Sequence, residues 1–107
     1  MSGSFGDMGN LLEQAQRMQK SLEDARTELR EARIVGQAGG GAVRATVDGM
    51  GTVHGVEVSP DAAKSGDSSM LGELVLAALN DAQSRAKRDH DERMAKVTGG
   101  LNLPGLL

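Results

Sequence analysis

The apolar residues between positions 8 and 32 recur at alternating intervals of three and four residues. This is the spacing of heptad positions a and d, so it predicts a long helix with a narrow apolar seam that packs along another helix. No Gly or Pro interrupts residues 10–35, and a helix of that length extends for roughly 35 Å. Because a chain of 107 residues has too small a core to cover such a seam, we expect a second copy of the chain to complete it. The seam residues expected in the core or at the dimer contact are Leu11, Ala15, Met18, Leu22, Ala25 and Leu29.

A glycine-rich turn and two strands are predicted after this helix. Gly36 ends the helical pattern, and residues 37–41 (Q-A-G-G-G) are typical of a flexible turn. Residues 42–48 alternate apolar and polar side chains, as a half-buried strand does. The segment Asp48-Gly49-Met50-Gly51 is a hairpin signal, and residues 52–59 supply the second strand.

The alternation of the second strand changes near Gly55. Val56 and Val58 share one face while Val53 falls on the other, so Gly55 marks a candidate β-bulge. Residues 33–35 could add a short strand before the turn. The predicted sheet is therefore antiparallel, with two or three strands.

A second long helix is predicted toward the end of the chain. Ser59-Pro60-Asp61 has the composition of a helix start, but only a brief turn is expected there. After Gly66, either Asp67 or Ser68 is expected to cap the long helix. Residues 83–93 hold a single apolar residue, so this part is expected to project into solvent. The apolar face expected to lie on the sheet comprises Leu71, Leu74, Val75, Ala78, Leu79 and Ala82.

These elements give the predicted fold class, α+β. A long N-terminal helix is followed by the antiparallel sheet and a long C-terminal helix. The length supports a single domain over residues 1–107. Its ends, about 1–8 and 98–107, are expected to be flexible, since T-G-G-L-N-L-P-G-L-L cannot continue a helix.

Composition narrows the classes of protein open to this chain. With one Phe, no Tyr and no Trp, the core must consist of Leu, Val, Ala and Met. With no Cys there is no disulfide, thiolate metal site or cysteine nucleophile, which fits a reducing cytoplasm. No stretch approaches the roughly 18 apolar residues of a membrane span, and the first ten residues lack the regions of a signal peptide. Neither export nor a membrane partner is expected.

No catalytic set can be assembled from the sequence. The glycines of residues 36–41 are not followed by Lys-Ser/Thr, and they join a helix to a strand, the reverse of a phosphate-binding loop. His90 lies in the run D-H-D-E, but consecutive helical residues point in different directions. His54 is interpreted as a sheet residue, since Glu57 is the only acid near it along the chain. We therefore expect no enzyme activity, metal, cofactor or small-molecule substrate.

Basic residues on the two helices remain as candidates for function. They alternate with acidic residues, and 15 acidic against 12 basic residues leave a net charge of −3. On the residues alone, the favoured interpretation is a solvated surface with supporting pairs such as Glu13 with Arg17.

Four segments stand in order along nearly the whole chain. They are G-N-L-L-E-Q-A-Q-R-M-Q (residues 9–19), G-x-x-G-G-G-x-V-x-A-T-V-x-G (36–49), V-x-V-x-P (56–60) and G-G-L-N-L-P-G (99–105). In this order and spacing, the chain resembles the YbaB/EbfC family of bacterial nucleoid-associated proteins. The resemblance implies an intertwined homodimer whose long helices project as arms, and which binds double-stranded DNA with weak sequence preference and alters its shape.

The resemblance also assigns a role to the basic residues and a location to the protein. It implies that the basic residues contact DNA phosphates, and that the protein lies in the cytoplasm, at the nucleoid. The lack of aromatic residues disfavours binding of single-stranded nucleic acid. The alternative, favoured by the net negative charge, is a dimeric protein–protein interaction module without direct DNA binding. The candidate DNA-binding residues are Arg17, Lys20, Arg26, Arg30, Arg85, Lys87, Arg88, Arg93 and Lys96.

Overall fold

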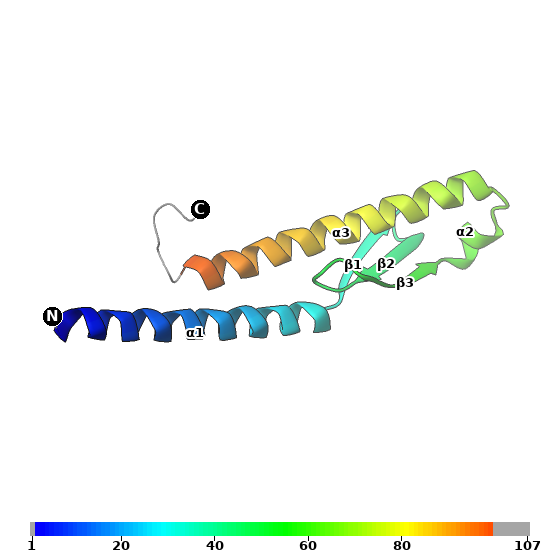
Figure 1. The fold of residues 1–107 in the computed structure, drawn as a ribbon. Helices are drawn as coiled ribbons and strands as arrows, with labels where there is room; N and C mark the ends of the chain where they lie inside the picture. The colour runs from blue at the N-terminus through cyan, green and yellow to red at the C-terminus, as the bar shows by residue number, and fades with distance from the viewer. Residues whose placement is uncertain (1, 100–107) are drawn as a thin grey trace.

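Two long helices and a three-stranded sheet make up the chain (Figure 1). The computed structural model describes residues 2–99, and side chains from Asp7 onward. The order is α1 (Ser2–Glu31), β1 (Ile34–Ala38), β2 (Val43–Val47), β3 (Val53–Val58), α2 (Pro60–Lys64) and α3 (Ser68–Gly99). With extents of 78 × 24 × 16 Å, the chain is elongated, because the helices extend well beyond the sheet. The predicted α+β order of elements is confirmed.

The helix α1 ends four residues earlier than the sequence pattern predicts. It stops at Glu31, and Ile34 and Val35 already belong to β1, where β-branched side chains are favoured. The expectation that Gly36 ends the helix is wrong. Gly36 lies within β1, where the strand approaches α3 so closely that a Cβ atom would overlap the backbone of Ala82. At the other end, α1 includes residues 2–8, which were expected to be flexible.

The sheet is antiparallel, with the strand order β1-β2-β3. The optional third strand is therefore present, and residues 37 and 38 belong to it instead of to the predicted turn. The turn itself consists of residues 39–42. Gly39, Gly40 and Gly41 there have φ values of 64°, 68° and 94°, a region that favours glycine.

A β-bulge interrupts the pairing of β2 with β3. Thr46 pairs with Gly55 and Val47 with Val53, so His54 is the extra residue on β3. The predicted bulge beside Gly55 is confirmed. Because paired residues of antiparallel strands share a face, the bulge returns Val53 to the same face as the other valines of β3.

The starts of α2 and α3 are capped as the sequence predicts. Ser59 Oγ accepts a hydrogen bond from the Ala62 N–H at 3.2 Å. Asp67 Oδ1 accepts one from the Met70 N–H at 3.0 Å, so Asp67 is the cap of α3. The helix α3 runs through residues 98 and 99, which were expected in the flexible tail. The remainder of that tail, residues 100–107, lies outside the described residues.

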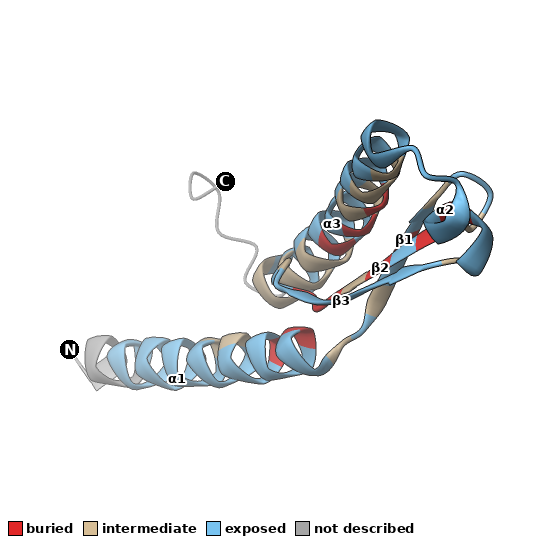
Figure 2. Cartoon of the chain, turned by 90° about the vertical axis from the view of Figure 1, so that its right-hand side faces the viewer, coloured by how far each residue is buried: buried red, intermediate tan, exposed pale blue. Residues whose placement is uncertain are grey.

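The core lies between α3 and the first two strands. Small residues on α3 allow the helix to approach the sheet, where it meets the inward valines of β2 (Figure 2). These buried residues are Val43, Ala45, Val47, Ala78, Ala82 and Ala86. The apolar face predicted on α3 is confirmed, since Leu71, Leu74, Val75 and Leu79 pack against this core.

The second half of α3 lies beside α1, so the expectation that residues 83–93 project into solvent is correct for most of these residues but not for all of them. Ala86 is buried, and Arg93 forms an ion pair with Glu28 of α1. The two helices run in opposite directions here (Figure 1). Ala86 belongs to the core with the buried valines of β2, while Arg93 reaches α1 through an ion pair, which a hydrophobic pattern does not reveal.

Candidate nucleic-acid interface

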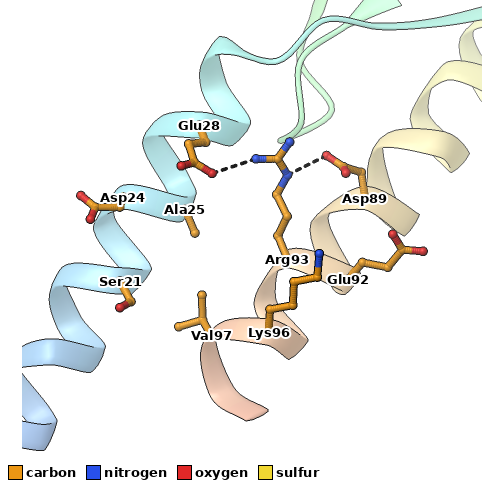
Figure 3. Close-up of a pocket in the computed structure, with 9 residues that line it drawn as sticks. All are labelled: Ser21, Asp24, Ala25, Glu28, Asp89, Glu92, Arg93, Lys96 and Val97. Atoms are coloured by element: carbon orange, nitrogen blue, oxygen red, sulfur yellow. Dashed lines mark hydrogen bonds and ion pairs between the residues drawn. The ribbon is translucent and has the colours of Figure 1, made fainter. Parts of the chain in front are cut away.

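An arginine joins the two helices where they lie beside each other (Figure 3). From α3, Arg93 donates through Nη1 to Glu28 Oε2 at 3.0 Å and through Nε to Asp89 Oδ2 at 3.1 Å. Its side chain is 34% exposed. Arg93, a candidate for DNA contact, thus already has two carboxylate partners within the protein.

The cleft around this arginine, which we call the inter-helix cleft, is acidic. It has a volume of about 420 Å³ between residues 21–28 of α1 and residues 89–97 of α3. Its charged lining consists of four acids, Asp24, Glu28, Asp89 and Glu92, against the two basic residues Arg93 and Lys96. This balance gives a formal charge of −2, which opposes entry of a phosphate backbone.

The basic residues on α1 point in several directions. Arg26 and Arg30 lie two residues on either side of Glu28, and at about 100° per residue both point away from the side of α1 that faces Arg93. Arg17 is exposed and lies 3.7 Å from Glu13, the pair expected from the sequence. Lys20 is exposed as well. The α1 candidates therefore do not form one continuous surface.

On α3, Arg85 is held by a carboxylate that also binds the sheet. Arg85 Nε lies 3.2 Å from Asp81 Oδ2, and the same oxygen accepts the Gln37 N–H of β1 at 3.0 Å. The Gln37 N–H lowers the pKa of Asp81, and the bond from Arg85 lowers it further. Asp81 stays ionised near neutral pH and fixes the direction of Arg85.

A second hollow gathers arginines from segments far apart in the sequence. About 450 Å³ in volume, it lies between the α1–β1 connection and α3, and we call it the arginine hollow. Four arginines, Arg33, Arg85, Arg88 and Arg93, line it against the two acids Asp89 and Glu92, a formal charge of +2. Arg33 is not one of the DNA-binding candidates predicted from the sequence. Lys87 lies elsewhere, near the β2–β3 turn with His90 and Asp91.

The apolar seam of α1 is only partly covered. Ala25 and Leu29 are buried, Met18 and Leu22 are half-buried, and Leu11 is 63% exposed. Ala15 is exposed too. Within one copy of the chain, the core therefore reaches only the end of the seam nearest the sheet.

A second uncovered apolar surface lies on β3, and sequence reasoning missed it. Val53, Val56 and Val58 pair with the buried residues Val47, Ala45 and Val43, so they face the side of the sheet on which α3 lies. The helix covers β1 and β2, however, and Val56 is 41% exposed. We call these three residues the β3 valine face.

The two histidines have different surroundings. His54 Nε2 lies 2.9 Å from Asp48 Oδ2 across the hairpin, so the interpretation that Glu57 is its only nearby acid is wrong. Asp48 also accepts the Met50 and Thr52 N–H groups, and the bond from His54 is the main cause of its lowered pKa. His90 lies 3.3 Å from Asp91 on the surface. Within residues 2–99, no three acidic, histidine or cysteine side chains gather as a metal site would require.

The sequence of nearly the whole chain matches one family of DNA-binding proteins. Residues 5–101 fit the sequence profile of the YbaB/EbfC DNA-binding family. The chain belongs to this family. Among the described residues, no helix combines the length and the apolar character that crossing a bilayer requires.

Relatives of this YbaB/EbfC chain carry names that agree with the family. The present chain is 41% identical to a nucleoid-associated protein of Clostridium acetobutylicum, over 94% of this chain and 90% of that protein. It is 38% identical to a nucleoid-associated protein of Alkaliphilus metalliredigens, over 97% of this chain and 91% of that protein. A crystal structure of an uncharacterized protein from Helicobacter pylori has the same fold, with a TM-score of 0.72 at 19% identity, covering 89% of this chain and 97% of that one.

Proposed function

We propose that the protein is a nucleoid-associated homodimer that binds double-stranded DNA with little sequence specificity and alters its conformation. The observation that carries this proposal is the match of nearly the whole chain to a DNA-binding family, with relatives named as nucleoid-associated proteins. Exposed arginines and lysines on both helices provide phosphate contacts. The location would be the cytoplasm, at the nucleoid, and we expect no catalytic step.

Little sequence specificity is supported by how the helices are connected. Direct reading of bases requires an element that enters a groove, such as the second helix of a helix-turn-helix. Here a three-stranded sheet separates α1 from the later helices, and the short helix α2 has five residues. The basic side chains instead lie along the sides of long helices, where phosphates are the accessible partners.

The dimer is supported by apolar surface that one copy leaves uncovered. The β3 valine face and the outer part of the α1 seam together expose large aliphatic side chains, including Leu11 and Val56. Among the described residues, no strand pairs with the outer side of the edge strand β3, which also presents a row of backbone groups there. A second copy would cover these surfaces, as the length of the seam already suggested.

Fluorescence energy transfer between dyes at the two ends of a random-sequence duplex tests the change in DNA conformation. We expect the transfer efficiency to change as the protein is added at low salt, and to return when salt dissociates the complex. A duplex that binds without any change in end-to-end distance would contradict the conformational part of the proposal. If random duplex does not bind at all, the interaction-module alternative, which the acidic inter-helix cleft favours, becomes the better account.

A further inference from the structure

The charges of the two hollows beside α3 are opposite. The inter-helix cleft has four acids against two basic residues, whereas the arginine hollow has four arginines against two acids. Asp89, Glu92 and Arg93 line both. The difference therefore comes from the charged residues that line only one of the two. These are Arg33, Arg85 and Arg88 in the arginine hollow, and Asp24, Glu28 and Lys96 in the inter-helix cleft.

We propose that the DNA backbone lies over the arginine hollow, on the outside of the helix pair, and that Arg33, Arg85 and Arg88 are its principal contacts. This inference rests on the proposed function and specifies where on the protein the duplex lies. A phosphate over the hollow meets a net positive lining, while one between the helices meets Asp24 and Glu28, two acids that do not line the hollow.

Two of the three arginines are held in position before DNA arrives. Arg33 Nη1 donates to the carbonyl oxygens of Arg30 and Ala32, each at 2.9 Å, at the carbonyl end of α1. Arg85 is fixed through its Nε by Asp81. Within the described part of the chain, neither bond uses the remaining terminal amino groups, so these stay available for phosphate oxygens. A side chain that is already ordered loses less conformational entropy on binding.

Arg88 adds a third, exposed charge to this pair. It lies one helical turn after Arg85, on the same side of α3, and its side chain makes no hydrogen bond or ion pair within residues 7–99. Phosphates of duplex DNA are closely spaced, at about one charge per 1.7 Å of helix axis. Three arginines from two segments can therefore meet neighbouring phosphates at once.

The test compares two double variants that remove the same charge from different sides of the molecule. Arg33→Gln with Arg88→Gln removes two contacts from the arginine hollow, and Arg26→Gln with Arg30→Gln is the matched control on the opposite side of α1. Fluorescence anisotropy with a random-sequence duplex measures affinity, while circular dichroism and sedimentation verify folding and mass. We expect the first variant to bind DNA about tenfold more weakly. Each lost contact should also reduce, by about 0.9, the slope of the logarithm of the binding constant against the logarithm of the salt concentration. The control variant should lose clearly less affinity, and its salt dependence should change less.

Two single variants keep the test decisive if Arg33→Gln disturbs the end of α1. Arg88→Gln alone should weaken binding by several-fold because it removes one phosphate contact. The fold should be retained, since no described side chain or backbone group forms a hydrogen bond or ion pair with that guanidinium. Asp24→Asn removes a charge found only in the inter-helix cleft and should leave affinity unchanged. Equal losses for the two double variants, no loss for Arg88→Gln, or tighter binding by Asp24→Asn would each overturn the inference. Failure of the wild-type protein to bind duplex would instead overturn the proposed function.

Discussion

Two glycines mark the closest approaches in the fold. A Cβ atom on Gly36 would overlap the backbone of Ala82, and one on Gly49 would lie 2.7 Å from the carbonyl oxygen of Leu29. The first contact brings β1 onto α3, and the second brings the hairpin onto the end of α1. At Gly36 all three nearest atoms belong to the backbone of α3, so a side chain cannot be accommodated there by a change of rotamer. At Gly49 the nearest atom is the Cδ2 of the Leu29 side chain, and the next two belong to the Leu29 backbone.

Gly36→Ala should therefore destabilise the protein strongly. We expect a loss of about 3 kcal/mol, because the added methyl group forces β1 away from α3. The matched control is Gly72→Ala, where no atom lies within 4 Å of the added Cβ. That change should be neutral or stabilise α3 by up to about 1 kcal/mol. Urea unfolding of both variants measures the difference, and equal stabilities would contradict the packing described here.

The buried carboxylate of Asp48 should make stability depend on pH on the acid side. Its pKa is lowered in the folded protein, chiefly by the bond from His54, so it contributes stability above the unfolded value of about 3.9. That contribution is lost as the pH falls through the lower folded pKa. Between pH 7 and pH 2, the midpoint temperature of thermal unfolding should fall less for Asp48→Asn than for the wild-type protein. The variant should have a lower midpoint than wild type at neutral pH. An identical acid profile for Asp48→Asn and wild type would exclude this role.

At the scale of elements, sequence predicts the long helices and the hairpin better than the segment between them. The long helix expected from the heptad spacing, the Asp48-Gly49 turn and the caps at Ser59 and Asp67 follow from local signals, and each is confirmed. The boundary between α1 and β1 was misplaced because Gly36 serves the packing of a strand, a requirement that depends on Ala82, which is distant in sequence. The arginine hollow was missed for the same reason, since it joins residues 33 and 85–93.

The β3 valine face gives a test of the dimer at this scale. Val56→Asp should dissociate the dimer, because it places a charge in the proposed contact, while the fold of each copy should survive, since Val56 is exposed there. Val35→Asp is the matched control, at a residue that is 50% exposed and paired with Thr46 on the opposite face of the sheet. Sedimentation should give the mass of the 11.1 kDa chain for the first variant and twice that mass for the control. A stable monomer for the wild-type protein would contradict the dimer itself.

At the scale of the whole molecule, an acidic protein is proposed to bind a polyanion. The net charge of −3 opposes association at long range. The distribution of charge matters more at contact, because the arginine hollow is positive while much of the acid lies in the inter-helix cleft and along α1. A dimer doubles the favourable contacts. We therefore expect modest affinity that depends strongly on salt.

The most direct test of DNA binding is an anisotropy titration of the wild-type protein with two duplexes of unrelated sequence, at several salt concentrations. The account predicts that both duplexes bind with similar affinity at low salt, and that the logarithm of the binding constant falls linearly with the logarithm of the salt concentration. Each phosphate contact contributes about −0.9 to that slope. Absence of binding to both duplexes at low salt, or binding to only one of them with little dependence on salt, would contradict it.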